Sequence, residues 1–286
     1  MNIDKTLAED IDRLVAQMLN EDVGSGDLTA GLLPAGTPGR ALVTTREAMT
    51  LAGRPWVDAL YRRLDASVSV EWLAADGDQL AGGDTLCRLA GPAQALLSGE
   101  RAALNILQTL SATATVTRRY AEAIEGTGCR VLDTRKTIPG LRLAQKYAVR
   151  CGGGSNHRIG LYDAILIKEN HIMAAGGIVE AVALAREQNP GIPVEVEVES
   201  LDELSIALGA APERVLLDNF ANGDLKTAVD TRNRTRTDTE LEASGNITLD
   251  DIRAVAETGV DFISIGALTK HVVAIDLSMR FATDQD

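Results

Sequence analysis

The second half of the chain alternates between strand-like and helix-like segments, and this alternation limits the possible folds more than any other feature. The strand-like segments are short apolar runs that end in charged or small residues: 130–134, 164–168, 194–199, 214–218, 239–243 and 261–265. Helical periodicity lies between several of them, at 178–188, 201–209 and 249–259. Such units predict a parallel sheet with helical crossovers. Six consecutive units favour an incomplete parallel α/β barrel, with a doubly wound open sheet as the alternative.

The first part of the chain has a different pattern. Apolar residues at one-face helical spacing predict an amphipathic helix: Leu7, Ile11, Leu14, Val15, Met18 and Leu19. The acidic stretch 21–27 then forms a connector, since it lacks the alternating ligands and closing Glu of an EF-hand loop. Strand-like runs follow at 40–46, 67–73 and 85–89, which predicts a small α+β domain.

A long helical segment at 98–126 leads from this domain into the alternating region. Its apolar stripe consists of Ala103, Leu107, Leu110 and Ala114. A length of 286 residues suits about two domains. We expect residues 1–112 to form the first domain and 113–271 the barrel, with the tail 272–286 returning to the first domain.

The charge of the chain excludes some classes of partner. Its formal charge of -13 argues against attraction of the whole surface to nucleic acid or to an anionic membrane. The segment from Arg130 to His171, however, contains eight Lys or Arg residues and three Asp or Glu residues, a local excess of five positive charges. We expect this segment to bind anions.

Targeting and cysteine content indicate the cytoplasm. The three cysteines are Cys87, Cys129 and Cys151, an odd number without a Cys-x-x-Cys pair, which suits neither a disulfide framework nor a zinc site. The N-terminus is acidic where a signal peptide would be basic, and no run of eighteen apolar residues occurs. We therefore expect no export and no membrane span.

Charged or small residues end every predicted strand. They are Arg135 and Lys136, then Lys168, then Glu197 and Glu199, then Asp218, then Ser244 and Gly245, and finally Gly266. Because the carboxyl ends of barrel strands meet at the mouth of the barrel, these residues predict a binding site there. The alternative is that some are ordinary polar loop starts.

Three glutamates alternate along the segment 194–199 and therefore share one face of a strand. A parallel barrel strand is buried on both faces, so such carboxylates need cations, a metal or hydroxyl donors. The alternative is an exposed edge strand, where charges are common.

The triple glycine 152–154 does not have the spacing of a phosphate-binding or dinucleotide-binding loop. Its glycines would instead allow His157 and Arg158 to approach a ligand closely. Among the three histidines, His157, His171 and His271, we favour His157 as the functional one, and their spacing argues against zinc.

Two small-residue loops follow the last two predicted strands, 244–246 and 265–267. Such loops in barrels bind phosphate through backbone amides and a helix N-terminus, and Thr248 is a reasonable N-cap for the next helix. Simple turns are the alternative.

Long motifs in this sequence resemble those of the quinolinate phosphoribosyltransferase family, the carboxylating nicotinate-nucleotide pyrophosphorylases. The motifs are EDVGSGDLT (21–29), SGERAALN (98–105), TRKT (134–137), GGGSNHRIGLYDAILIKENH (152–171), EVEVES (195–200), LDNF (217–220), ASGN (243–246) and SIGALT (264–269). They extend over nearly the whole chain, and their length and order make the resemblance specific.

The resemblance implies a fold and a reaction. The fold is an N-terminal α/β sandwich beside an incomplete, about six-stranded parallel α/β barrel. The reaction joins quinolinate and phosphoribosyl pyrophosphate, with Mg²⁺, into nicotinate mononucleotide, pyrophosphate and CO₂. The resemblance also implies a homodimer, or an assembly of dimers, with sites between subunits.

The resemblance further implies roles for individual residues. Quinolinate carboxylates would be held by Arg135, His157, Arg158 and Lys168, with Arg101 supplied by the neighbouring subunit. Phosphoribosyl pyrophosphate would face Lys136 and Lys168, and its ribose hydroxyls and the magnesium would meet Glu197 and Asp218. The 5-phosphate would lie against Ser244, Gly245, Asn246 and Gly266. Thr134, Ile265 and Ala267 would also belong to the substrate-binding residues.

Two other functions remain open from the residues. One is a related phosphoribosyltransferase for another pyridine or aromatic acid, such as nicotinate phosphoribosyltransferase or the molybdenum-operon homologue. The other is a non-catalytic phosphosugar-binding barrel, in which Glu197 and Asp218 would be dispensable.

Overall fold

A computed structural model describes residues 3–235 and 237–282, so residues 283–286 of the tail expected to return lie outside the described residues. The chain forms two compact units. The first comprises residues 1–118, 137–153 and 269–286, and the second comprises 119–136 and 154–268. Among the described residues, no helix is both long enough and apolar enough to cross a membrane.

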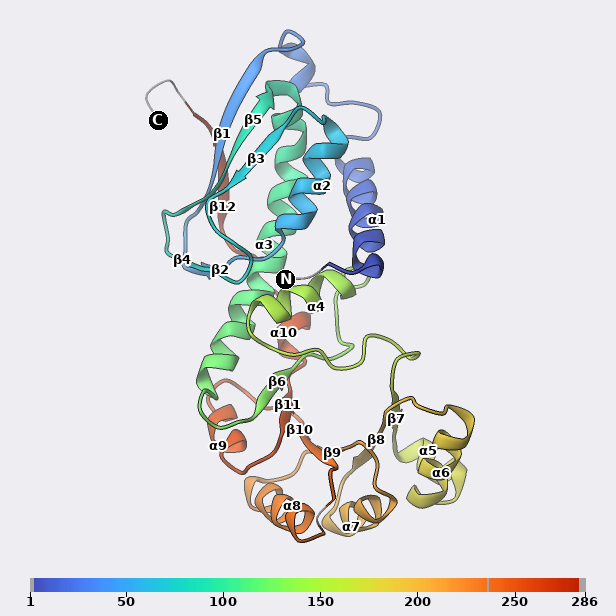
Figure 1. The fold of residues 1–286 in the computed structure, drawn as a ribbon. Helices are drawn as coiled ribbons and strands as arrows, with labels where there is room; N and C mark the ends of the chain where they lie inside the picture. The colour runs from blue at the N-terminus through green and yellow to red at the C-terminus, as the bar shows by residue number, and fades with distance from the viewer. Residues whose placement is uncertain (1–2, 236, 283–286) are drawn as a thin grey trace. The chain divides into compact units, whose positions relative to one another are not determined.

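The first unit is built on an antiparallel sheet with the strand order β12-β1-β5-β3. Its strands are β1 (Pro38–Thr45), β3 (Ser69–Trp72), β5 (Thr85–Pro92) and β12 (Leu277–Phe281), and a small pair is formed by β2 (Met49–Thr50) and β4 (Gln79–Leu80). The helices are α1 (Lys5–Asp22), the 3₁₀ turn η1 (Ala30–Leu32), α2 (Arg54–Leu64), most of α3 (Ala93–Ala123), α4 (Arg142–Cys151) and α10 (Ala267–Lys270), which starts at the end of the second unit. Figure 1 shows α2 and α3 beside the sheet.

Helix packing in the first unit follows the apolar pattern of the sequence. The predicted stripe of α3, with Leu107 and Leu110 at its centre, is buried, and so are Leu7, Ile11, Leu14 and Val15 of α1. Helices α2 and α3 approach closely at Gly99, where a Cβ atom would lie 2.6 Å from the ring of Tyr61. A layer of helices against one antiparallel sheet confirms the predicted α/β sandwich.

The second unit contains the predicted parallel sheet of six strands. They are β6 (Arg130–Leu132), β7 (Ile165–Ile167), β8 (Val194–Val198), β9 (Arg214–Asp218), β10 (Glu240–Ser244) and β11 (Phe262–Ser264). The helices are α5 (Glu169–Ala175), α6 (Ile178–Gln188), α7 (Leu201–Ala210), α8 (Asn222–Thr235) and α9 (Ile252–Ala256). Each predicted strand is present within about two residues of its expected bounds.

The strand order decides between the barrel and the open sheet. It runs β6-β11-β10-β9-β8-β7, so the last strand of the series pairs with the first and the other neighbours are consecutive in the chain. A doubly wound sheet would reverse direction at its centre. The cyclic order with β6 and β7 as edges is that of an incomplete barrel, which confirms the predicted fold class. At the β6 edge, Leu132 also forms an isolated parallel bridge with Ser155.

One face of the six-stranded sheet carries an unusual number of charged side chains. The register pairs Glu195 with Arg214, Arg214 with Glu240, and Glu242 with Phe262, so these side chains point to the same side. The Phe262 ring lies between two guanidinium groups, with Arg130 4.5 Å and Arg214 4.0 Å from its centroid. Cation–π contacts and ion pairs thus fill this face at the amino ends of the strands.

Candidate active site

The residues expected at the mouth of the barrel lie on the same charged face of the sheet, at the opposite ends of the strands. Glu197 pairs in register with Leu216, two residues before Asp218, and Asp218 pairs with Ser244. Because alternate residues of a strand share a face, Glu197, Asp218 and Ser244 point to one side. The parallel sheet therefore brings together residues that are up to 47 positions apart in the sequence.

A second group of residues surrounds the end of β6. The Thr134 hydroxyl accepts the backbone N–H of Lys136 at 3.0 Å. The Lys136 side chain then passes over Gly266, where a Cβ atom would lie 3.1 Å from Lys136 Cδ. Glycine at 266 thus lets the ammonium-bearing chain lie against the backbone that follows β11.

Arg135 and Arg158 form a cationic pair within the second unit. Burial lowers the pKa of the Arg158 guanidinium, and the positive charge of Arg135 lowers it further. Arg158 is anchored by its Nη1, which donates to the Ala164 carbonyl oxygen at 3.4 Å. The two positive charges repel each other, so an anion that binds near both guanidinium groups relieves the repulsion.

Lys168 and Glu197 form an ion pair across neighbouring strand ends, from Lys168 Nζ to Glu197 Oε2. Lys168 directly precedes α5, and its backbone N–H donates to Nδ1 of His171 at 3.0 Å. His171 thereby fixes the backbone at the start of this short helix.

The loop after β10 packs against the residue that follows Asp218. Asn219 donates its backbone N–H to the Ser244 carbonyl oxygen at 2.8 Å, and its side-chain amide donates to Asp218 Oδ2 at 2.8 Å. A Cβ atom at Gly245 would collide with the Asn219 side chain, and Gly245 has φ +115°. Asn246 also has a positive φ, 41°. Strained backbone of this kind is typical of ligand-binding loops.

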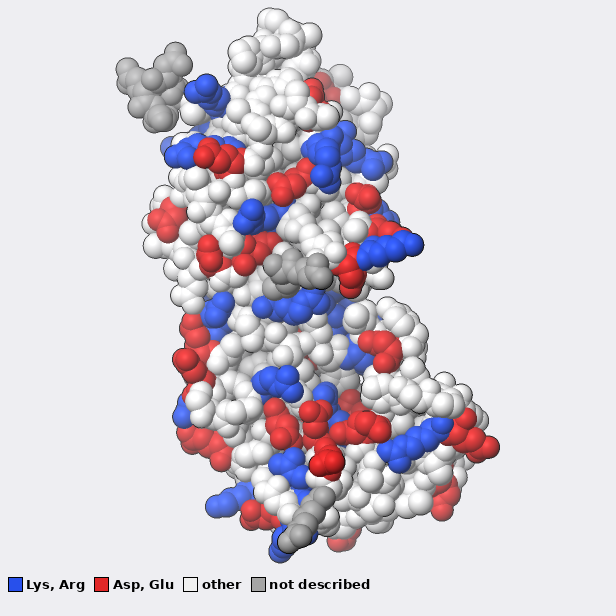
Figure 2. Space-filling model, in the orientation of Figure 1, with Lys and Arg blue, Asp and Glu red and all other residues white. Residues whose placement is uncertain are grey.

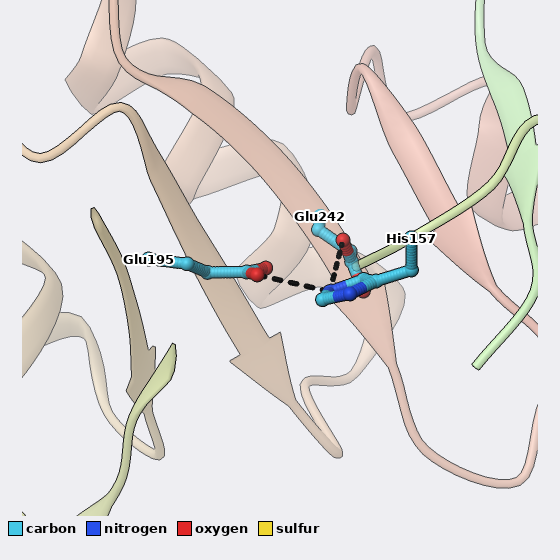
Figure 3. Close-up of side chains that lie close together, drawn as sticks. All are labelled: His157, Glu195 and Glu242. Atoms are coloured by element: carbon cyan, nitrogen blue, oxygen red, sulfur yellow. Dashed lines mark ion pairs between the residues drawn. The ribbon is translucent and has the colours of Figure 1, made fainter. Parts of the chain in front are cut away.

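His157 is enclosed by polar partners inside the second unit. Its Nε2 lies 2.9 Å from Glu195 Oε2 and 3.5 Å from Glu242 Oε2, and the three side chains point toward one another in Figure 3. Its Nδ1 accepts the backbone N–H of Arg158 at 2.7 Å. Its own backbone N–H donates to Asp133 Oδ1 at 2.9 Å.

The pKa values of this cluster are shifted by burial and by mutual charge. Burial raises the pKa of Glu242 to about 7, helped by the nearby Glu195 carboxylate. Burial would also raise the pKa of Glu195, but His157 and Arg214 lower it overall. Burial lowers the pKa of His157, and the Glu195 and Glu242 carboxylates more than offset that effect.

Ligand atoms of His157, Glu195 and Glu242 lie within 4.8 Å of one another, a spacing that could hold a metal ion. A cation of the protein is already there, because Arg214 Nη1 is 3.1 Å from Glu242 Oε2. With Nδ1 of His157 also engaged, the geometry favours an internal polar network over a metal centre.

Glu197 and Asp218 provide a donor set that fits magnesium better. They are carboxylates at the carboxyl ends of adjacent strands on the same face, and magnesium prefers a few carboxylate oxygens together with water and phosphate. Both are only partly exposed.

Some expectations from the sequence were wrong. Strand β8 lies between β9 and β7, which overturns the edge-strand alternative for its glutamates. The helix after Asn246 begins at Ile252 with Asp251 as its N-cap, not near Thr248, because residues 249–251 form a turn first.

The triple glycine has a structural role that the sequence did not indicate. A Cβ atom at Gly152 would collide with the Ala114 carbonyl oxygen and approach Thr117, so this glycine lets α4 end against α3. Gly153 has φ +87°, which a glycine adopts readily.

Other predicted residues lie in distinct places. Arg101 is exposed on α3 in the first unit. Ile265 is 2% exposed and bonds through its N–H to the Leu132 carbonyl oxygen, and Ala267 begins α10. Of the eight clustered cations, Arg142, Lys146 and Arg150 lie on α4, which belongs to the first unit.

Three polar residues of this region were missed by sequence reasoning as site components: Asp133, Arg214 and Glu242. Asp133 and Glu242 were detectable in principle, because each is an acidic residue inside or directly after an apolar strand. Both side chains are 0% exposed, and a buried carboxyl group needs a hydrogen-bond partner within the protein.

Two family models match this sequence. Family models for the N-terminal and C-terminal domains of quinolinate phosphoribosyl transferase match residues 27–111 and 113–280. The chain belongs to the quinolinate phosphoribosyltransferase family.

Individual relatives agree with this assignment. A probable nicotinate-nucleotide pyrophosphorylase [carboxylating] from Synechocystis is 41% identical over 271 residues, 94% of this chain and 92% of the relative. The Mycobacterium leprae nicotinate-nucleotide pyrophosphorylase [carboxylating] is 40% identical over 93% of this chain and 95% of its own length. The solved structure of nicotinate-nucleotide pyrophosphorylase from Francisella tularensis has a TM-score of 0.94 and 46% identity, and the match covers 99% of both chains. Quinolinate phosphoribosyltransferases thus share the whole fold with this chain.

Proposed function

We propose that this protein transfers the phosphoribosyl group of phosphoribosyl pyrophosphate to quinolinate and decarboxylates the product to nicotinate mononucleotide, with release of pyrophosphate and CO₂. The observation that carries the proposal is the set of cations at the carboxyl ends of the strands, beside two carboxylates, in a member of this family. The set comprises Arg135, Lys136, Arg158 and Lys168, and the carboxylates are Glu197 and Asp218.

Quinolinate is a dianion and its co-substrate is a polyphosphate, so the site must hold two negatively charged molecules in contact. The Arg135 and Arg158 pair suits the dicarboxylate, because each planar guanidinium can donate two parallel hydrogen bonds to a carboxylate. Lys136, which lies over Gly266, and Lys168 suit the diphosphate. In this proposal Lys168 turns from Glu197 toward the substrates when they bind.

Departure of pyrophosphate leaves positive charge on the ribose carbon, as in glycoside cleavage. Glu197 and Asp218 would stabilise that charge and accept hydrogen bonds from the ribose hydroxyls. The 5-phosphate would lie against the backbone of residues 244–246 and 265–267, with Thr134 beside it. The left-handed backbone of Asn246, which few residues other than glycine adopt, supports this placement.

The pyridine nitrogen is already nucleophilic, so no general base is needed for the transfer. Ribosylation makes that nitrogen cationic. Loss of the adjacent carboxylate as CO₂ then leaves an anion beside the cation, so decarboxylation follows transfer.

We propose Mg²⁺ as the cofactor, held by Glu197 and Asp218 either directly or through water. Magnesium would offset the negative charge of the diphosphate when bound. The common face of these two residues supports the proposal.

We further propose a cytoplasmic homo-oligomer, a dimer or an assembly of dimers, in which Arg101 reaches the neighbouring site. Arg101 is exposed, and within the described part of the chain it has no hydrogen bond or ion pair. Cys87, Cys129 and Cys151 are all free thiols, which supports a reducing compartment.

The test is an assay of CO₂ released from carboxyl-labelled quinolinate, with phosphoribosyl pyrophosphate and magnesium. Release that requires both substrates is expected. Nicotinate, which lacks the second carboxylate, is expected to react about 10⁴-fold less efficiently, because the cations that bind that carboxylate would be left unpaired in the occupied site. Efficient turnover of nicotinate without CO₂ release would instead favour a related phosphoribosyltransferase, and no turnover of either acid would favour a non-catalytic barrel.

A further inference from the structure

His157 has no polar atom available for a substrate carboxylate. Its ring carries two nitrogen atoms, and each already has a protein partner. Nε2 is 2.9 Å from Glu195 Oε2, and Nδ1 accepts the Arg158 N–H at 2.7 Å. Because Nδ1 accepts, the ring proton is on Nε2 and points toward Glu195.

The partners of His157 are more deeply buried than His157 itself. Glu195 and Glu242 side chains are 7% and 0% exposed, and Arg214 Nη1 lies 3.1 Å from the same Glu242 oxygen, Oε2, that His157 approaches. The two glutamates and Arg214 lie on β8, β10 and β9, three neighbouring strands of the sheet. The sheet therefore presents two carboxylates to the His157 ring, as Figure 3 shows.

Hydrogen bonds hold the segment 154–164 on both sides of Arg158. Asp133 accepts the His157 backbone N–H at 2.9 Å and the Asn156 amide at 2.6 Å. On the other side, Asp163 accepts the N–H groups of Ile159 and Gly160 at 2.7 and 2.9 Å. Arg158 lies between these two anchors, and the hydrogen bond to Nδ1 of His157 fixes its own backbone amide.

We propose that His157 is a positioning residue, held by Glu195 and Glu242 so that its Nδ1 fixes the backbone of Arg158 and aims the Arg158 guanidinium at the quinolinate carboxylate. Glu195 and Glu242 are then required for quinolinate affinity without touching the substrate. This inference rests on the proposed function, because it takes quinolinate as the ligand.

Two substitutions of His157 separate positioning from direct contact. Asn can place an oxygen close to the Nδ1 position, whereas Gln can place its amide close to the Nε2 position. If His157 acts through the Arg158 N–H, His157→Asn retains quinolinate affinity within about threefold, and His157→Gln weakens it roughly tenfold, the effect of one net hydrogen bond. The reverse ranking, measured by titration calorimetry with quinolinate, overturns the proposal.

A double-mutant cycle with Arg158 tests the path of the effect. His157→Gln is expected to weaken quinolinate binding roughly tenfold in the wild-type background and less than twofold in the Arg158→Ala background. An equal loss in both backgrounds would mean that His157 contacts quinolinate itself. Glu195→Leu should follow the same pattern, and the His157 variants decide the outcome if Glu195→Leu does not fold.

Glu240→Gln is the matched control. Glu240 binds the same Arg214 at 2.9 Å and lies on the same strand as Glu242, but its side chain is 42% exposed whereas that of Glu242 is 0% exposed. Its quinolinate affinity should equal that of the wild type, and a tenfold loss would show that any change at Arg214 disturbs the site, against the proposal. Wild-type protein that does not bind quinolinate would refute the proposed function itself, an outcome distinct from an additive cycle.

Discussion

The buried carboxyl group of Glu242 should make the stability of the protein fall as pH rises. Its side chain is 0% exposed, and burial raises its pKa from 4.5 to about 7. A carboxyl group with a raised folded-state pKa binds more protons in the folded protein than in the unfolded chain between those two values. Stability is therefore fully present below about pH 4.5 and is lost as pH rises to about 7.

The variant Glu242→Gln removes this titration and keeps the shape of the side chain. Between pH 5 and pH 8, the wild type should lose roughly 2 to 3 kcal/mol of unfolding free energy relative to the variant, from the shift of 4.5 to about 7. Arg214 acts against this cost, because its positive charge favours ionised Glu242. The difference between the two proteins cancels every other titrating group that the substitution leaves unchanged.

Urea unfolding at pH 5, 6, 7 and 8, followed by circular dichroism, measures this difference. Glu240→Gln is the control, since Glu240 is 42% exposed and pairs with the same Arg214. A stability difference between wild type and Glu242→Gln that stays constant over this pH range would refute the reasoning, because Glu242 would then be ionised or protonated throughout.

Three further predictions concern the site. Arg135→Ala should abolish quinolinate turnover while phosphoribosyl pyrophosphate still binds, because Arg135 pairs with Arg158 for the dicarboxylate; unchanged steady-state turnover would remove Arg135 from the site. Arg101→Ala subunits mixed with Lys136→Ala subunits should recover part of the activity if sites are shared, and no recovery would contradict the shared site. Gly245→Ala should destabilise the protein by about 1 to 3 kcal/mol in urea unfolding and raise the KM for phosphoribosyl pyrophosphate, because φ is +115° and a Cβ atom would collide with Asn219; wild-type values for both would show that the loop adapts freely.

Most helices and strands could be predicted from the sequence, because the spacing of apolar residues within a short segment indicates a helix or a strand. The stripe through Leu107 and Leu110 identified the buried face of α3, since that spacing places side chains on one side of a helix. The run 214–218 matched β9 at both ends, because the apolar segment is bounded by charged residues. Helices α2 and α5 were not predicted. Helix α5 has seven residues and none of them is buried, so it carries no apolar stripe.

The charged stretch between Arg130 and His171 shows the limit of linear reasoning. Its cations are close in sequence, but Arg130 lies at the amino end of β6 against Phe262, while Arg135 follows the carboxyl end of the same strand. Lys146 belongs to α4 in the other unit and is 1% exposed. Sequence proximity therefore overstated how many of these charges share a surface, because Lys146 is buried and Arg130 and Arg135 lie at opposite ends of β6.

The sequence by itself determined which residues end the strands, since a strand and its last residue are local features. Residues such as Lys168, Glu197 and Asp218 could be chosen in this way, and the family resemblance gave them roles. Only the tertiary structure determined which side chains lie next to the ends and the interiors of these strands. The register of parallel strands brings Glu195, Glu242 and Arg214 to one face, and a separate segment inserts His157 among them. No local sequence pattern predicts this cluster, because the pairing of distant strands depends on the packing of the whole sheet.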